Sequence, residues 1–181
     1  MMEDFLAVAQ EKRFLGREFL TWLVHRIESG DARFEIDGSV VELALGDRVV
    51  LEGGPADRAR LTVVGEGDLR VEMGAGLRRG KLLDRARLVV RRGERHWELT
   101  LDGGMLVYEG LRCPALGARD GDGNDDVRAG FENDLFLRLA DVEDAIGVLD
   151  QLFADFCRLR GAAAWATRTL PALREWVDTL R

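Results

Sequence analysis

The densest group of chemically active side chains in this sequence is a run of basic residues at positions 78–95. Only two acidic residues, Asp84 and Glu94, lie in the same stretch. The eight basic residues are Arg78, Arg79, Lys81, Arg85, Arg87, Arg91, Arg92 and Arg95. A guanidinium group presents a planar fork of N–H donors that matches phosphate oxygens. Exposed together, these side chains would form a surface that follows the DNA backbone, with an affinity that falls as salt rises.

A strand through this stretch would sort its side chains by face, because successive residues of a strand point to opposite sides. Arg85, Arg87 and Arg91 would then share one face. Leu88 and Val90 would share the other. We weigh DNA binding against a simpler interpretation, a solvated strand face whose arginines pair with carboxylates. Charge runs are usually solvent faces, and the net charge of the whole chain is −7.

The other reactive side chains are few. The chain has two histidines, two serines, two cysteines and one tyrosine. Nucleophilic catalysis requires a nucleophile beside a base, and few such pairs can be assembled from this set. Cys113 and Cys157 are too few for a disulfide framework and have no zinc-binding partner motif. We therefore expect a protein that is not an enzyme, with no metal and no cofactor.

One acidic segment, residues 120–125, begins like a calcium-binding loop, with oxygen donors at alternate positions. The pattern then fails, because Asp125 stands where the sharp-turn glycine belongs and Phe131 where the bidentate glutamate belongs. We interpret the segment as an acidic loop. A metal- or carboxylate-dependent nuclease is accordingly a hypothesis without a supporting motif.

The first elements that must position these side chains are a helix and a series of strands. Apolar residues recur at spacings of three and four over residues 5–28, which predicts an amphipathic helix. Asp37-Gly38 between apolar runs predicts a β-hairpin. Further short strands are expected at residues 48–52, 60–64, 69–73, 86–92, 95–101 and 105–108. Glycine-containing turns such as Gly46-Asp47 would separate them, and residues 77–83 would form a short helix or loop.

The C-terminal third predicts helices. A heptad-like apolar pattern covers residues 135–156, Gly161 ends the helix, and Leu170-Pro171 predicts a new helix start. Trp165 and Trp176 lie in the terminal helices. We consider both as interface anchors and, alternatively, as core residues, since aromatic side chains are enriched in both places.

Together these elements predict one α+β domain over residues 1–181. It would contain an N-terminal helix (1–30), a mostly antiparallel sheet of short strands (31–112), an acidic loop (113–130) and C-terminal helices packed on the sheet (131–181). No apolar run of membrane-spanning length and no leader pattern is visible. We expect no membrane contact and a cytoplasmic location.

Several segments resemble the RdgC-like recombination-associated proteins of bacteria. The sequence FLGREFLTWL at residues 14–23 resembles one of their segments, and residues 47–51 are similar to an early strand. Residues 77–83 resemble a turn with a Gly-Lys pair, followed by similar paired strands at 87–101. Gly110-Leu111-Arg112, the acidic loop and the long helix complete the series. The resemblance covers most of this chain but only about the latter half of a full-length family member.

Proteins of that family bind DNA with little sequence preference, form ring-shaped dimers around it and restrain the recombinase RecA. The resemblance implies a nucleoid-associated, homo-oligomeric DNA-binding protein that modulates recombination or DNA maintenance. Its partners would be the DNA backbone and a recombinase or another DNA-maintenance protein. A ring around DNA is not implied, because the family's N-terminal half has no counterpart here. The alternative is a protein–protein interaction module, or assembly subunit, that uses the C-terminal helices and does not touch DNA.

Overall fold

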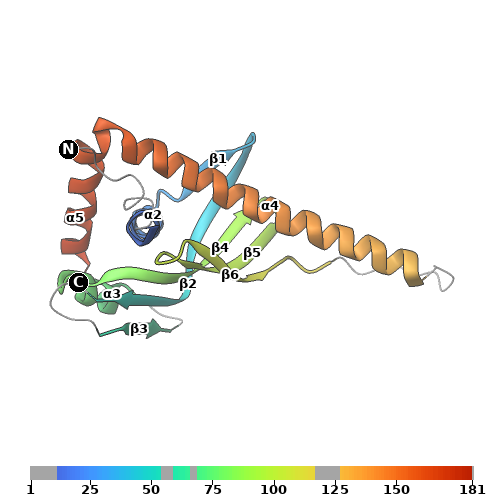
Figure 1. Ribbon diagram of the computed structural model, residues 1–181, viewed down its shortest axis with the longest axis horizontal. Helices are drawn as coiled ribbons and strands as arrows, with labels where there is room; N and C mark the ends of the chain where they lie inside the picture. The colour runs from blue at the N-terminus through green and yellow to red at the C-terminus, as the bar shows by residue number, and fades with distance from the viewer. Residues whose placement is uncertain (1–11, 54–58, 66–68, 117–126, 181) are drawn as a thin grey trace.

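The protein has the predicted α+β fold: its described residues form an N-terminal helix, six strands and C-terminal helices, with one further helix between the third and fourth strands (Figure 1). The computed structural model describes residues 12–53, 59–65, 69–116 and 127–180. Among these residues, no helix combines the length and the apolar character needed to cross a membrane. The buried apolar side chains form one cluster that runs from Phe19 to Leu180.

All strand pairs in the single sheet are antiparallel, as predicted. The strands are β1 (Arg33–Ile36), β2 (Ser39–Glu52), β3 (Leu61–Val64), β4 (Leu82–Arg92), β5 (Arg95–Asp102) and β6 (Val107–Arg112). Their order across the sheet is β1-β2-β4-β5-β6, and β3 also pairs with β2. The hairpin between β1 and β2 turns at Asp37 and Gly38, whose φ angles of 50° and 70° require the left-handed region. The hairpin prediction is confirmed.

The turn predicted at Gly46-Asp47 is wrong, because β2 is one strand of 14 residues. Its register against β4 shifts between Leu45 and Val49, which marks an irregularity within the strand. A Cβ atom on Gly46 would lie 2.9 Å from Cγ of Arg87. Glycine is therefore needed here for the passage of the Arg87 side chain, and not for a chain reversal.

The strand predicted at residues 69–73 is also wrong, because α3 (Arg70–Arg78) is a helix. Its apolar and polar residues alternate over only five positions, too few to distinguish a strand from a helix. The helix packs through small residues: a Cβ on Gly74 would lie 2.5 Å from Cβ of Leu180, and one on Gly76 would lie 3.1 Å from a methyl group of Leu51. Close packing against distant segments therefore determines this element.

The first described helix, α2 (Lys12–Glu28), lies between the sheet and the long helix α4 (Val127–Gly161) (Figure 1). Phe19 of α2 is fully buried, with its ring centroid 5.2 Å from that of Phe153 and 5.4 Å from that of Phe156 in α4. Residues 1–11 of the predicted first helix lie outside the described residues. A π-helical turn, η1 (Trp165–Thr169), leads directly into α5 (Leu170–Thr179).

Candidate anion-binding face of the sheet

One face of the sheet has no described helix over it, and we call it the open face. In Figure 1, α2 and α4 lie on the opposite side. Strand β4 alternates as predicted: Ala86, Leu88 and Val90 are buried towards the helices. Arg85 and Arg87 are half-buried, and Arg91 is exposed. These three arginines therefore share the open face.

The remaining members of the predicted cluster lie elsewhere. Arg92 is on the helical side of β4 and forms an ion pair of 2.6 Å with Asp144 of α4. Arg95 also pairs with Asp144, at 2.6 Å, and its guanidinium carbon lies 5.2 Å from the Trp97 ring centroid. Helix α4 thus neutralises two basic side chains that the sequence groups with the DNA-binding set.

The basic residues around the end of α3 also have structural roles. Arg78 donates a hydrogen bond to the carbonyl oxygen of Leu180. Lys81 is only 6% exposed and donates a bond of 2.5 Å to the carbonyl oxygen of Ala59. Arg79 is exposed. Two of these three side chains therefore fix the chain and are poorly placed to contact a ligand.

A hollow of about 150 Å³ lies on the open face. Four arginines and two threonines contribute most of its polar lining: Arg48, Arg60, Arg85, Arg87, Thr62 and Thr100. Glu109 is the one acidic residue among the described residues that line it. Arg48 and Arg60 were not part of the sequence prediction. The pairing of β2 with both β3 and β4 brings them to Arg85, and no local signal in the sequence shows this pairing.

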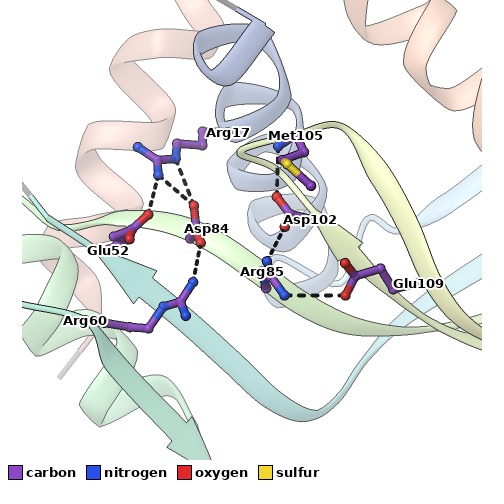
Figure 2. A network of polar contacts seen from close by, with 8 residues as sticks. All are labelled: Arg17, Glu52, Arg60, Asp84, Arg85, Asp102, Met105 and Glu109. Carbon is purple, nitrogen blue, oxygen red and sulfur yellow. Dashed lines mark hydrogen bonds and ion pairs between the residues drawn. The ribbon is translucent and has the colours of Figure 1, made fainter.

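Two buried carboxylates hold the guanidinium groups of this region (Figure 2). Asp102 is 2% exposed, and its Oδ2 lies 2.7 Å from Nη2 of Arg85. Its Oδ1 accepts a 2.8 Å hydrogen bond from the backbone N–H of Met105. A carboxylate with partners on both oxygens is a stable anchor for Arg85, because neither oxygen is left unpaired on burial.

Asp84 is the second anchor and is 4% exposed. Its Oδ1 lies 2.6 Å from Nη2 of Arg17 on α2, and its Oδ2 lies 3.3 Å from Nη2 of Arg60. Burial alone would raise the pKa of Asp84, but the hydrogen bonds and charges of Arg17 and Arg60 outweigh burial, and the pKa is lowered. Asp84 is therefore ionised at neutral pH, and it links α2 to the rim of the hollow.

Carboxylates also lie on the open face itself. Arg87 pairs with Glu98 at 2.5 Å and with Asp47 at 3.3 Å. Within the described residues, no ion pair is found for Arg48 or Arg91. These two exposed arginines are the positions at which an external anion meets the least competition from the protein's own carboxylates.

The proposed interface anchors belong to the core. Trp165 is 5% exposed and Trp176 is 7% exposed, so neither ring is available on the surface of this chain. Large exposed apolar side chains occur instead along α4, whose N-terminal half extends beyond the sheet in Figure 1. They are Phe131, Leu135, Phe136, Leu137, Leu139 and Ile146. The heptad pattern predicted Leu135, Leu139 and Ile146 of this stripe, but not that these side chains would be exposed.

No metal-binding group of three or more His, Cys, Asp or Glu side chains occurs in the described part of the chain. The acidic segment at residues 120–125 lies outside the described residues. In comparisons with known proteins, no protein-family model, curated protein or solved structure matches this chain. A function must therefore be inferred from the arginines of the open face and from the exposed apolar side chains of α4.

Proposed function

We propose that this protein binds the phosphate backbone of DNA through its open face, without base recognition and without catalysis. The observation that carries the proposal is the arginine-rich face that no described helix covers. Phosphate contacts position a protein on a duplex without reading its sequence. The resemblance to RdgC-like proteins is in line with the same function, and it would imply a role in recombination or DNA maintenance at the nucleoid.

The contacts on this face reduce the set of residues proposed for DNA binding. Arg85 and Arg87 are held by carboxylates, so DNA would have to compete for them. Arg48 and Arg91 have no ion pair within the part of the chain that the structure describes, and we propose them as the principal phosphate contacts. The acidic remainder of the molecule would repel DNA elsewhere and would orient this face towards it.

The test is fluorescence anisotropy of a labelled random-sequence duplex, titrated with protein over a salt series. The logarithm of the affinity should fall linearly with the logarithm of the salt concentration, with a slope of about 0.9 per phosphate neutralised. The double variant Arg48→Glu and Arg91→Glu should abolish binding. The variant Arg85→Glu is unsuitable as a test, because its new carboxylate would lie beside the buried carboxylate of Asp102.

The matched control is the double variant Arg168→Glu and Arg174→Glu. Both arginines are exposed on η1 and α5, away from the open face, and the change in net charge is the same. This variant should retain most of the wild-type affinity. Absence of binding at low salt, or equal losses in the two double variants, would refute DNA binding by the open face.

A second candidate function is assembly with another copy of this chain through α4. Its support is the apolar stripe whose second half is buried in the core, at Leu152 and Phe156, and whose first half is exposed. Burial of exposed apolar surface is the main driving force of association, and large exposed patches mark interaction sites. Antiparallel pairing of two α4 helices would cover Leu135 and Leu139.

Light scattering coupled to size-exclusion chromatography tests this assembly. The wild type should be a dimer, and the double variant Leu135→Asp and Leu139→Asp a monomer. The control Asn133→Asp and Ala140→Asp adds the same charge at other exposed positions of α4 and should leave the dimer intact. A monomeric wild type at high concentration would rule the assembly out.

A further inference from the structure

The hollow on the open face offers more hydrogen-bond donors than its own carboxylates use. An arginine side chain has five N–H donors. Arg60 uses one nitrogen, Nη2, to contact Asp84. The Nε atom of Arg85 is buried and has no hydrogen-bond partner. A buried donor without a partner is costly. Arg48, which also lines the hollow, has no ion pair within the described residues, so its donors are not engaged by those carboxylates.

The donors around the hollow come from several directions. Arg48 belongs to β2, Arg60 precedes β3, and Arg85 and Arg87 belong to β4. The hydroxyl groups of Thr62 and Thr100, on β3 and β5, complete the ring. A planar carboxylate accepts hydrogen bonds mainly within one plane. A tetrahedral phosphate group presents several oxygens to a surrounding set of donors, and Arg is well suited to it.

The donors are also held in place before any ligand arrives. Buried Asp84 and Asp102 hold Arg60 and Arg85 through ion pairs (Figure 2). Such preorganisation reduces the entropy lost on binding. A cavity of about 150 Å³ can accommodate a molecule of the size of benzene, and the hollow has that volume. It is therefore matched to one small anionic group and not to a long segment of polymer.

We propose that this hollow binds a terminal phosphate group, either inorganic phosphate or the dianionic end of a phosphomonoester. A backbone phosphodiester carries one negative charge and two ester links, whereas a terminal phosphate presents three free oxygens to the four arginines. The inference goes beyond backbone binding, because a hollow that captures a terminal phosphate does so whether or not a duplex lies along the open face.

Isothermal titration calorimetry with inorganic phosphate at constant ionic strength tests this site. Saturable binding of one phosphate per chain is expected. The variant Arg48→Gln removes a lining guanidinium that has no ion pair among the described residues, and it should weaken binding about 10-fold. Arg174→Gln is the matched control, since it removes the same charge from an exposed position of α5, away from the hollow. It should change the affinity less than about 2-fold.

The variant Glu109→Gln provides a test of the opposite sign. It removes the carboxylate of the one acidic residue described in the lining, which contacts Arg85 at 3.4 Å, and should tighten phosphate binding. A misfolded protein cannot produce this gain. Absence of saturable phosphate binding would overturn the proposal. Equal losses for Arg48→Gln and Arg174→Gln would also overturn it, because they would show general charge attraction only.

Two competitors distinguish the possible sources of the phosphate. Phenyl phosphate represents a small phosphomonoester, and a 5′-phosphorylated oligonucleotide represents a DNA end, compared with the same oligonucleotide bearing a 5′-hydroxyl. Preference for the phosphorylated oligonucleotide would assign the site to strand ends. Displacement by phenyl phosphate alone would assign it to a small ligand. Phosphate binding with no affinity for duplex would support the site and refute the DNA function.

Discussion

The polar network around Asp84 connects the first helix to the candidate site. Its carboxylate is nearly inaccessible, yet it accepts contacts from Arg17 on α2 and from Arg60 before β3. Arg17 also pairs with Glu52 at 2.8 Å. Removal of one member of a buried ion pair is expensive, because the remaining charge stays desolvated. The network therefore contributes both to stability and to the position of Arg60.

Asp84→Asn should lower the free energy of unfolding by about 2–3 kcal/mol, at the lower end of the cost for breaking buried pairs because Arg60 is half exposed. Urea denaturation at neutral pH measures the change. Asp47→Asn is the control: this exposed carboxylate contacts Arg87 at 3.3 Å, and its loss should cost less than about 1 kcal/mol. Similar costs for the two variants would contradict an anchoring role for Asp84.

At the scale of the elements, the close approach of α2 to the link between β5 and β6 requires a glycine. A Cβ on Gly16 would lie 2.3 Å from the backbone oxygen of Gly103. Neither atom belongs to a flexible side chain, so relief would require movement of the backbone. Gly16 lies in the FLGREFLTWL segment at residues 14–23, and its role is packing.

Gly16→Ala should therefore destabilise the protein by about 2 kcal/mol, although alanine is favoured over glycine in a helix by about 1 kcal/mol. Gly147→Ala is the matched control, because Gly147 is also helical and nothing lies within 4 Å of its added Cβ. This second variant should raise the free energy of unfolding by up to about 1 kcal/mol. Thermal and urea unfolding of both variants would show opposite signs. A neutral Gly16→Ala would contradict the close approach.

The two halves of α4 should also differ in how much they contribute to the stability of the protein. Leu152 is fully buried, whereas Leu135 is 49% exposed. Leu152→Ala should lower the free energy of unfolding by about 3 kcal/mol, because it leaves a cavity in the core. Leu135→Ala should cost less than about 0.5 kcal/mol in the monomer. A large cost for Leu135→Ala in dilute solution would show that the N-terminal half of α4 is packed after all.

These elements show which features the sequence can predict and which it cannot. The hairpin at Asp37-Gly38 and the alternation of β4 follow local rules, and both are confirmed. The hollow depends on strand pairings that bring Arg48, Arg60 and Arg85 together across the chain. Arg92 and Arg95, which the prediction placed in the cluster, instead form ion pairs with Asp144 of α4, about 50 positions away along the chain. Long-range partners of this kind have no local signature.

At the scale of the whole molecule, the fold divides the basic residues between two roles. Those on the helical side form ion pairs that link the helices to the sheet. Arg17 of α2 contacts Asp84 of β4, and Arg92 of β4 contacts Asp144 of α4. Those on the open face surround the hollow or remain exposed. An acidic protein can in this way present a local basic surface, although its net charge is −7. The distribution of charge, and not its sum, is the relevant quantity for a phosphate ligand.

The burial of His25 predicts how the stability of the protein depends on pH. Burial lowers the pKa of His25 from its ordinary value of 6.5, the charge of Arg26 lowers it further, and Asp31 partly opposes both. The Nδ1 atom of His25 is buried without a partner, and the ring lies against Trp176 with centroids 5.4 Å apart. Below pH 6.5 the unfolded chain takes up this proton more readily than the folded chain does. The contribution of neutral His25 to stability is therefore fully present above pH 6.5, and it falls as the pH drops towards the lowered pKa.

Asp84 adds a second loss at lower pH. Its pKa is lowered from 3.8 in the fold, so its contribution is present above pH 3.8 and is lost as the pH falls through the lowered value. Urea denaturation between about pH 8 and pH 3 should show both declines. His25→Gln cannot take up the proton and should flatten the curve just below pH 6.5, while Asp84→Asn should flatten only the more acidic part. If His25→Gln retained the full wild-type slope near pH 6, the loss would belong to another group, and the burial of His25 beside Trp176 would not govern acid sensitivity.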